Sequence, residues 1–466
     1  MNQRSSVAPL DVVVLAAGKG TRMRSARPKV LQPLGGEPLL AHVLRAVAGL
    51  SPQQVHLVVG HGQADVRAWA ETRADVAASL TWVEQTEQLG TGHAVRLSAP
   101  GWTPGSVIVI AYGDVPLISS ATLADAARAA QAQVVIITAR VADPQGYGRI
   151  VRDAAGQVSA IVEHADATSA QQAINEINTG VIAAPAEWLA PWLAALTKQN
   201  PKGEYYLTDV IAMAVAAGRP VTGLCAADAA ELEGVNDRAQ LARAERRLQQ
   251  QRADTLMQTG VTLADPARID VRGSLVCGRD VHIDVGCVFE GQVELGDDVT
   301  IGPYCHLRDV QLGDGAVIES HSVLEGVVAE AKVHVGPFAR LRPGTRLATA
   351  AKVGNFVETK KAIVGPGSKI NHLSYVGDAE LGADVNVGAG TITCNYDGAN
   401  KHLTRIGDRA FIGSNSALVA PVEIGSDATI GAGSVIAKPA PAGQLTVSRS
   451  KQMSLPGWQR PTKHKP

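Results

Sequence analysis

A glycine-rich segment follows the first strongly apolar run of the chain. The run ends at Leu15, the loop continues through Gly18 and Gly20, and the cations Arg22 and Lys29 come shortly after it. Glycines let backbone N–H groups cradle phosphate oxygens, and the two cations are able to neutralise charge on a phosphate under attack. The segment lacks both the G-K-[ST] ending of a P-loop and the G-x-G-x-x-G pattern of a dinucleotide-binding loop. It therefore predicts a phosphate site of another kind.

A carboxylate follows a second apolar run. The run covers residues 107–110 and continues through three residues to Asp114. An aspartate at the end of a strand is often only the cap of a helix. Beside a triphosphate, however, a hard Mg²⁺ ion needs oxygen ligands, and Asp114 is placed to supply one. The two segments together favour metal-dependent chemistry on a phosphate.

A histidine interrupts the regular pattern of the C-terminal half. It is His372, and further along an insertion lies between Thr393 and Ile406. Acyl transfer from a thioester to an amine needs a base near neutral pH, and imidazole has the appropriate intrinsic pKa. A histidine on a regular repeat would by itself be a packing or surface residue, so this prediction depends on the motif around it. The insertion is placed to leave its coil and reach a neighbouring subunit.

The elements that must position the first two segments follow an α/β pattern up to about residue 236. Four short β-branched runs predict buried parallel strands: residues 12–15, 56–59, 107–110 and 134–137. Alanine-rich segments between them, such as 121–132, predict helices on both faces of a parallel sheet. Ligands of such a fold bind at the carboxyl ends of the strands, where the glycine-rich loop and Asp114 lie.

The rhythm of the sequence then changes twice. Residues 237–258 contain no Gly or Pro and predict one long, largely exposed helix that acts as a rigid connector. From about residue 260 aliphatic side chains recur at every sixth position, as in Ile406, Ile412, Leu418, Ile424, Ile430 and Ile436. A repeat of this period predicts a parallel β-helix with one aliphatic side chain per short strand pointing inward. Such a narrow interior accounts for an aromatic content of only 4%.

Composition limits the partners of the chain. Its 466 residues predict two or three domains, and a formal charge of -1 gives no reason to expect nucleic acid or a membrane surface as partner. The five cysteines form neither a metal-ligand spacing nor a disulfide framework, which indicates reduced thiols. We expect a cytoplasmic protein, because the first residues lack the apolar stretch of a signal peptide and no run is long enough to span a bilayer.

The string from Leu15 to Lys29 resembles the signature of sugar-nucleotide pyrophosphorylases. Later segments resemble the uracil-reading segment (residues 85–94), the sugar-binding positions and, at Asn236, the second metal ligand of that family. Alone, each of these amides and carboxylates would be a turn or a solvated loop residue. The resemblance implies that Arg22 and Lys29 assist catalysis, that Asp114 and Asn236 hold Mg²⁺, and that nucleotide and sugar contact Leu15, Ala16, Ala17, Gly18, Lys29, Gln85, Gly90, Thr91, Tyr112, Gly113, Asp114, Gly148, Glu163, Asn178 and Asn236.

Over essentially its whole length the chain is similar to the bifunctional N-acetylglucosamine-1-phosphate uridyltransferase / glucosamine-1-phosphate N-acetyltransferase family. The resemblance implies a left-handed β-helix, a homotrimer with acetyl sites shared between subunits, and His372 as general base. It places the sugar phosphate at Arg342 and Lys360, and the sugar at Tyr375 and Asn386. It places acetyl-CoA at Ala389, Asn395, Tyr396, Ser414, Ala432 and Arg449.

These features predict two activities on one chain. Residues 1–238 form a Rossmann-like α/β uridyltransferase domain, residues 239–259 a linker helix, and residues 260–466 an N-acetyltransferase β-helix with a C-terminal tail. Glucosamine 1-phosphate is acetylated from acetyl-CoA, and the N-acetylglucosamine 1-phosphate then reacts with UTP and releases pyrophosphate. One alternative keeps the first enzyme and makes the β-helix a non-catalytic trimerising module. A second is a sugar-nucleotide-binding scaffold without turnover.

Overall fold

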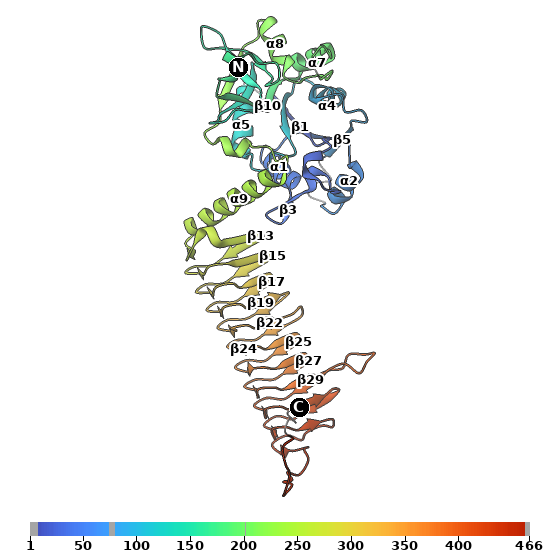
Figure 1. Cartoon of the computed structure of the whole chain (residues 1–466), viewed down its shortest axis with the longest axis vertical. Helices are drawn as coiled ribbons and strands as arrows, with labels where there is room; N and C mark the ends of the chain where they lie inside the picture. Colours follow the sequence, from blue (N-terminus) through green and yellow to red (C-terminus); the bar gives the residue numbers. More distant parts are fainter. Residues whose placement is uncertain (1–7, 74–79, 201, 462–466) are drawn as a thin grey trace, which may run out of the picture. The chain divides into compact units, whose positions relative to one another are not determined.

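The structure is a computed structural model that describes residues 8–73, 80–200 and 202–461 (Figure 1). The chain divides into two compact units, residues 1–248 and 249–466. The division falls inside helix α9 (Arg238–Gln258), so the helix predicted for residues 237–258 is confirmed and contributes residues to both units. The division into three parts at 238 and 259 stays a prediction. Among the described residues, no helix has the length and apolarity needed to cross a bilayer.

The first unit contains one large sheet with strand order β11-β7-β10-β6-β1-β4-β5, to which β8 and β9 are added. Its strands are β1 (Leu10–Leu15), β4 (Gln54–Val59), β5 (Leu80–Glu84), β6 (Val107–Tyr112), β7 (Val134–Arg140), β8 (Arg149–Arg152), β9 (Val158–Val162), β10 (Glu176–Pro185) and β11 (Val221–Cys225). The four predicted strands β1, β4, β6 and β7 are all present. These four strands run in one direction, as predicted, but the sheet as a whole is mixed, because β10 runs antiparallel between β6 and β7.

Helices cover both faces of this sheet. They are α1 (Leu39–Ala48), α2 (Gln63–Glu71), α4 (Thr91–Ser98), α5 (Ser120–Ala129), α6 (Ser169–Gln172), α7 (Ala186–Ala195) and α8 (Asp209–Ala216). Side chains alternate along a strand, so Val12 and Val14 of β1 pack with α1 and α5, whereas Val13 and Leu15 pack with α4, α7 and α8. Helices thus bury both faces of the sheet, so a binding site is expected at the ends of its strands.

The second unit is a left-handed parallel β-helix whose strands stack coil upon coil (Figure 1). One ladder consists of short strands: β12 (Thr262–Leu263), β14 (His282–Ile283), β16 (Thr300–Ile301), β18 (Val317–Ile318), β21 (His334–Val335), β24 (Lys352–Asn355), β26 (Lys369–His372), β28 (Asn386–Val387), β31 (Phe411–Ile412), β34 (Thr429–Ile430) and β36 (Leu445–Thr446).

The other ladder contains strands of two to nine residues. They are β13 (Ile269–Cys277), β15 (Cys287–Leu295), β17 (His306–Leu312), β19 (Val323–Glu325), β20 (Val328–Ala329), β22 (Arg340–Leu341), β23 (Arg346–Leu347), β25 (Glu358–Val364), β27 (Tyr375–Leu381), β29 (Ile392–Cys394), β30 (Thr404–Ile406), β32 (Ala417–Val419), β33 (Val422–Ile424) and β35 (Val435–Ile436). The six aliphatic side chains from Ile406 to Ile436 are all at most 4% exposed, which confirms the repeat of six.

One aromatic ring lies in this otherwise aliphatic core. Phe289 is fully buried, and we expect Phe289→Ala to lower the free energy of unfolding of the β-helix by about 3–5 kcal/mol, because it removes a ring and leaves a cavity. Urea unfolding followed by circular dichroism measures the change. The control is Val276→Ala, since Val276 is 61% exposed and its loss should change stability by less than about 0.5 kcal/mol. Equal effects of the two variants would contradict this account of the core.

Candidate functional sites

A cavity of about 330 Å³ opens at the carboxyl ends of β1 and β6. It brings together ten of the predicted nucleotide-binding residues: Leu15, Ala16, Ala17, Gly18, Lys29, Gln85, Gly90, Thr91, Tyr112 and Asp114. Gly113 lies against the same strands, since its N–H donates to the carbonyl of Leu15 at 2.9 Å. The cavity therefore lies where the sequence places it, at the ends of parallel strands.

The predicted uracil-reading segment is tied to the glycine-rich loop. The Gln88 side-chain N–H donates to the Ala17 carbonyl at 2.6 Å, and that of Gln85 donates to the Gly90 carbonyl at 3.1 Å. Gly90 has a φ of 108°, and a Cβ there would come within 2.6 Å of the Tyr205 carbonyl. Only glycine fits this close approach. The segment predicted to read the base and the loop predicted to bind phosphate thus share one rim of the cavity.

The sequence analysis missed one part of this rim. Glu204 lines the cavity. The backbone N–H of the neighbouring Tyr205 donates to the Leu89 carbonyl at 2.8 Å, and the Tyr205 carbonyl accepts from the Gly92 N–H at 2.9 Å. Nothing local in the sequence marks residues 204–205, because their role depends on tertiary contacts with a segment more than a hundred residues earlier.

The two predicted metal ligands lie beside one another. The Val235 N–H donates to the backbone carbonyl of Asp114 at 2.8 Å, which brings the next residue, Asn236, to the aspartate. The ammonium group of Lys29 contacts both, with a hydrogen bond to the Asp114 carboxylate and another of 3.1 Å to the Asn236 side-chain oxygen. The Asp114 carboxylate and the Asn236 amide oxygen therefore both contact the Lys29 ammonium group.

This pair fits Mg²⁺ chemically. Mg²⁺ takes oxygen ligands, and in nucleotide enzymes it uses one or two protein oxygens and leaves the other positions to phosphate and water. Within the described ranges, no group of three or more His, Cys, Asp and Glu side chains is arranged to hold a metal ion. Asp114 and Asn236 offer two oxygen donors of the kind that a phosphate-bound metal takes.

The three predicted sugar-binding positions lie near one another: Gly148 directly before β8, Glu163 directly after β9, and Asn178 on β10. The Asn178 N–H donates to the Gly148 carbonyl at 2.8 Å, and a Cβ at Gly148 would lie 3.7 Å from Glu163 Oε1. Tyr112 links this group to the cavity, because a Cβ at Gly180, two residues after Asn178, would lie 2.5 Å from its ring. Burial, with the charges of Asp114 and Glu163, raises the pKa of Tyr112, so its hydroxyl stays neutral.

The two predicted catalytic cations of this site, Arg22 and Lys29, are placed differently. Arg22 is exposed in the short helix η1 (Thr21–Met23) and does not line the cavity. Its neighbour Met23 is buried and anchors the turn. Gly20 lies against Lys29, since a Cβ at Gly20 would be 2.7 Å from the Cβ of Lys29. The structure thus brings Lys29 to the cavity, while the catalytic role of Arg22 stays a prediction.

On the β-helix, several predicted residues fall into one column. His372 is exposed at the end of β26, two residues after the inward-facing Ile370. The strand register aligns Ile370 with Val387, Ile412 and Ile430 in successive coils. Two residues after each of these come Ala389, Ser414 and Ala432. The predicted base and three predicted acetyl-CoA residues thus follow one edge of the β-helix, where small side chains leave room beside the histidine.

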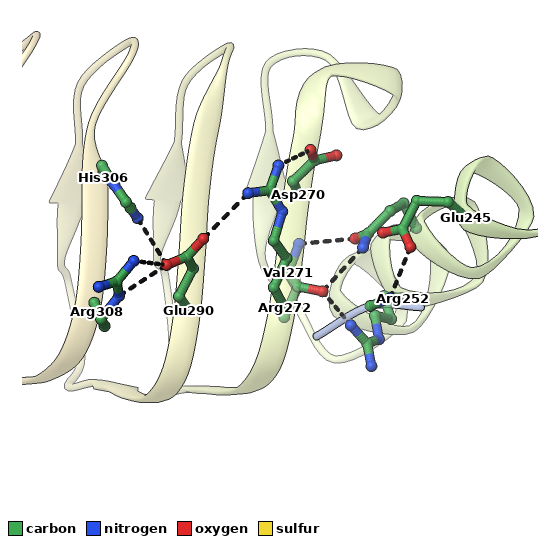
Figure 2. A network of polar contacts seen from close by, with 10 residues as sticks. Glu245, Arg252, Asp270, Val271, Arg272, Glu290, His306 and Arg308 are labelled. Atoms are coloured by element: carbon green, nitrogen blue, oxygen red, sulfur yellow. Dashed lines mark hydrogen bonds and ion pairs between the residues drawn. The ribbon is translucent and has the colours of Figure 1, made fainter. Parts of the chain in front are cut away.

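A ladder of alternating charges leads to the predicted phosphate site. Arg272, Glu290, Arg308 and Glu325 are register neighbours in successive coils. Glu290 lies between the two arginines, with a 3.1 Å contact to Arg272 and a 2.8 Å contact to Arg308 (Figure 2). The hydrogen bond from Arg308 lowers the pKa of Glu290. Each charge in this part of the ladder is therefore balanced by a neighbour.

The alternation breaks at Arg342 and Lys360. These two cations follow the register pair Leu341 and Thr359, so they occupy adjacent rungs, and the next rung is Gly377. Arg342 contacts Glu358 at 2.9 Å, whereas the structure gives Lys360 no ion pair with any residue it describes. Two neighbouring cations with one carboxylate leave a net positive charge, which suits a phosphate group.

Gly377 also joins the predicted sugar and acetyl-CoA residues. A Cβ at this position would lie 2.4 Å from the Tyr375 hydroxyl and 2.9 Å from the Asn395 side-chain nitrogen. Both side chains therefore lie over the bare backbone of one glycine. Asn386 of β28 is the register partner of Lys369 of β26, in the next coil along the chain. The Arg449 guanidinium donates a hydrogen bond to the Ala432 carbonyl at 2.8 Å.

The predicted insertion forms a short hairpin. Tyr396 and Lys401 pair across it, and the Lys401 ammonium lies 4.2 Å from the centre of the Tyr396 ring. Asp397 accepts hydrogen bonds from the Asn400 backbone and from His402, which lower its pKa. Tyr396 is 55% exposed, so the hairpin presents an aromatic surface beyond its own coil.

The five cysteines form no disulfide in the structure. All five are free, as predicted, and burial raises the pKa of Cys287 to about 11 and that of Cys305 to about 12. Thiols with such values are protonated and unreactive near neutral pH.

Comparisons with known proteins agree with this two-part organisation. Residues 12–255 match the MobA-like NTP transferase domain, and residues 403–438 match the bacterial transferase hexapeptide (six repeats). Three relatives, each named bifunctional protein GlmU, come from Alkalilimnicola ehrlichii (56% identical, over 97% of this chain and 96% of the relative), Marinobacter nauticus (54%, 98% and 100%) and Xanthomonas euvesicatoria pv. vesicatoria (55%, 98% and 99%). The chain therefore belongs to the family of bifunctional GlmU proteins, which joins a nucleotidyltransferase to a hexapeptide-repeat transferase.

Proposed function

We propose that the two units catalyse successive steps in the synthesis of UDP-N-acetylglucosamine. The β-helix acetylates glucosamine 1-phosphate, and the α/β unit transfers the uridylyl group of UTP to the product. The observation that carries this proposal is the clustering of predicted residues around two separate sites, one at the strand ends of the sheet and one along an edge of the β-helix. A non-catalytic β-helix would need neither the exposed His372 nor the charge of Lys360, which forms no ion pair within the described part of the chain.

In the acetyl transfer, the amine of glucosamine 1-phosphate attacks the thioester carbonyl carbon of acetyl-CoA. A C–N bond forms, the C–S bond breaks, and the ammonium group gives up two protons. His372 accepts one as general base, and the other goes to the departing thiolate of CoA. Lys360 and Arg342 hold the phosphate, Tyr375 and Asn386 position the sugar, and Ser414 is a donor for the thioester carbonyl.

In the uridylyl transfer, a phosphate oxygen of N-acetylglucosamine 1-phosphate attacks the α-phosphorus of UTP. The bond to the β-phosphate breaks, and pyrophosphate leaves. Backbone N–H groups of residues 15–18 hold the phosphates, and residues 85–91 hold the base. Lys29 supplies positive charge, and Gly148, Glu163 and Asn178 orient the sugar. Such a transfer depends on positioning and charge neutralisation.

Mg²⁺ bound by Asp114 and Asn236 would supply the charge that stabilises the pentavalent arrangement at phosphorus. The oxygen donor set of these two residues supports this assignment, since it matches the preference of a hard cation. Lys29 contacts both oxygens and is proposed to turn toward a phosphate when substrate is bound.

We also propose a homotrimer. Four rings follow one another along one edge of the β-helix, namely Tyr304, His321, Phe338 and Phe356, with centroid distances of 5.2, 4.8 and 5.4 Å. Phe338 and Phe356 are 48% and 56% exposed, so an apolar edge is left in water that a second subunit would cover. Sedimentation equilibrium should give three times the mass of the chain, and a monomer would contradict the proposal. The cytoplasmic location stays a prediction.

The phosphate site gives a further prediction. We expect Lys360→Ala to raise the KM for glucosamine 1-phosphate about 10- to 100-fold, because it removes a charge-assisted contact of about 1.5–3 kcal/mol. Steady-state acetylation at varied sugar phosphate measures the effect. The control is Arg346→Ala, which removes an exposed cation on neighbouring β23 and should leave KM unchanged. An unchanged KM in Lys360→Ala would contradict the assignment.

The whole proposal is tested by incubating the protein with glucosamine 1-phosphate, acetyl-CoA, UTP and Mg²⁺. We expect UDP-N-acetylglucosamine, free CoA and pyrophosphate in equal amounts. Without acetyl-CoA no nucleotide sugar should form from glucosamine 1-phosphate at a comparable rate. Formation of pyrophosphate without free CoA thiol would favour the alternative in which the β-helix is a scaffold.

A further inference from the structure

Two strands of the short-strand ladder differ from all others that the structure describes in it. β24 (Lys352–Asn355) and β26 (Lys369–His372) have four residues each, whereas the remaining strands from β12 to β36 have two. The extra residues end in Asn355 and His372. The extension is therefore confined to the coil that carries the proposed base and to the coil directly before it.

The extension depends on a very close approach of two backbones. A Cβ at Gly354 would lie 2.0 Å from the Asn371 carbonyl oxygen, so no other residue fits there without moving the strand. The pairing then continues to Asn355 and His372, which are direct register partners. The backbone beyond them is also fixed, since the Leu373 N–H donates to the Asn355 carbonyl at 3.1 Å.

This register places the Asn355 amide against the imidazole. The Asn355 Oδ1 and His372 Nδ1 atoms are 2.6 Å apart. An amide oxygen only accepts hydrogen bonds, so Nδ1 must be the donor and must carry the proton of the neutral ring. The other nitrogen, Nε2, is then unprotonated and free to take a proton from a substrate. If the proton were on Nε2 instead, the neutral ring would have no basic nitrogen on its open side.

We infer that Asn355 is a positioning residue for acetyl transfer, which holds His372 in the tautomer with a basic Nε2. The inference rests on the proposed role of His372 as general base. Asn355 acts through the imidazole and needs no contact with the substrates. The four-residue strands exist, on this reading, to carry one hydrogen bond between adjacent coils.

The surrounding charges do not replace this contact. The structure gives His372 no ion pair with any described residue. The other ionisable side chains on its own strand β26 and on β24, β25 and β27 are Lys352, Glu358, Lys360, Lys361, Lys369, Tyr375, Asp378 and Glu380. Asn355 makes a side-chain hydrogen bond to the imidazole, so a substitution of Asn355 should alter the protonation of the ring most directly.

Two substitutions test the inference. In Asn355→Asp a carboxylate replaces the amide, keeps the acceptor and favours the protonated ring, so the acidic limb of the kcat/KM profile should move up by about one pH unit or more. In Asn355→Ala the acceptor is lost, and kcat should fall about tenfold with little change in KM. The control is Lys352→Ala, which alters an exposed side chain of the same strand and should leave rate and profile unchanged.

A second measurement does not depend on turnover. The ¹⁵N spectrum of the His372 ring in the full-length protein should show the proton on Nδ1 in the unaltered chain, and a mixture of tautomers in Asn355→Ala. A proton on Nε2 in the unaltered chain, or an unmoved acidic limb in Asn355→Asp, would overturn the inference. His372→Ala is assayed alongside: if it retains acetyl transfer, the proposed base itself is wrong, whereas its inactivity with unmoved Asn355 profiles overturns only the role of Asn355.

Discussion

His372→Ala is expected to reduce acetyl transfer about 10²–10⁴-fold and to leave uridylyl transfer from N-acetylglucosamine 1-phosphate at its original rate. The loss has the size typical of a removed general base. The second rate should not change, because His372 lies in the β-helix, while the nucleotide cavity is built within residues 15–204. Release of CoA thiol and release of pyrophosphate measure the two reactions separately.

A matched control is available on the same ladder. His334 lies on β21, its Nε2 is 3.2 Å from a carboxylate oxygen of Glu319, and it is not a predicted site residue. His334→Ala should retain both activities. A similar loss in both variants would mean that the effect of His372→Ala is structural, and loss of both activities together in His372→Ala would contradict the division of labour.

Asp114→Asn is expected to reduce uridylyl transfer about 10³-fold while acetyl transfer continues. The substitution keeps the shape of the side chain but removes the negative charge that faces the Lys29 ammonium and would hold the metal. Lost metal-ion stabilisation of the transition state is worth several kcal/mol, and each 1.36 kcal/mol is about tenfold in rate.

The control for this variant is Asp65→Asn, which removes an exposed carboxylate from α2. Its pyrophosphate release should equal that of the unaltered chain. Binding of Mn²⁺ in the presence of UTP gives a readout besides activity, and it should weaken in Asp114→Asn alone. An unchanged rate of uridylyl transfer in Asp114→Asn would contradict the assignment of Asp114 as a metal ligand.

Much of the fold could be predicted because its signals are local. The apolar runs give the strands β1, β4, β6 and β7, and the step of six residues gives the β-helix, since every inward side chain repeats the same environment. The helix α9 was predicted from the absence of Gly and Pro. The glycine-rich loop and Asp114 could be placed at the cavity because loops after parallel strands meet at one edge of the sheet. The other cavity residues were predicted from the resemblance to sugar-nucleotide pyrophosphorylases.

Other features depend on contacts between distant segments, so no local sequence pattern indicates them. The apolar sequence of β10 does not specify which strands it pairs with, so its antiparallel position between β6 and β7 could not be predicted. Glu204 reaches the cavity only through tertiary packing, and Arg22 does not line it. Asn355 stands seventeen residues before His372, where only the coil length of the β-helix makes them neighbours.

The most direct test of the two-site account is one experiment on Asp114→Asn and His372→Ala, assayed alone and mixed, with glucosamine 1-phosphate, acetyl-CoA, UTP and Mg²⁺. Each variant alone should yield little UDP-N-acetylglucosamine: the first should accumulate N-acetylglucosamine 1-phosphate, and the second should leave glucosamine 1-phosphate unreacted. The mixture should restore the nucleotide sugar, because the intermediate passes through solution. Failure of the mixture, although each variant keeps its own remaining activity, would contradict two independent active sites.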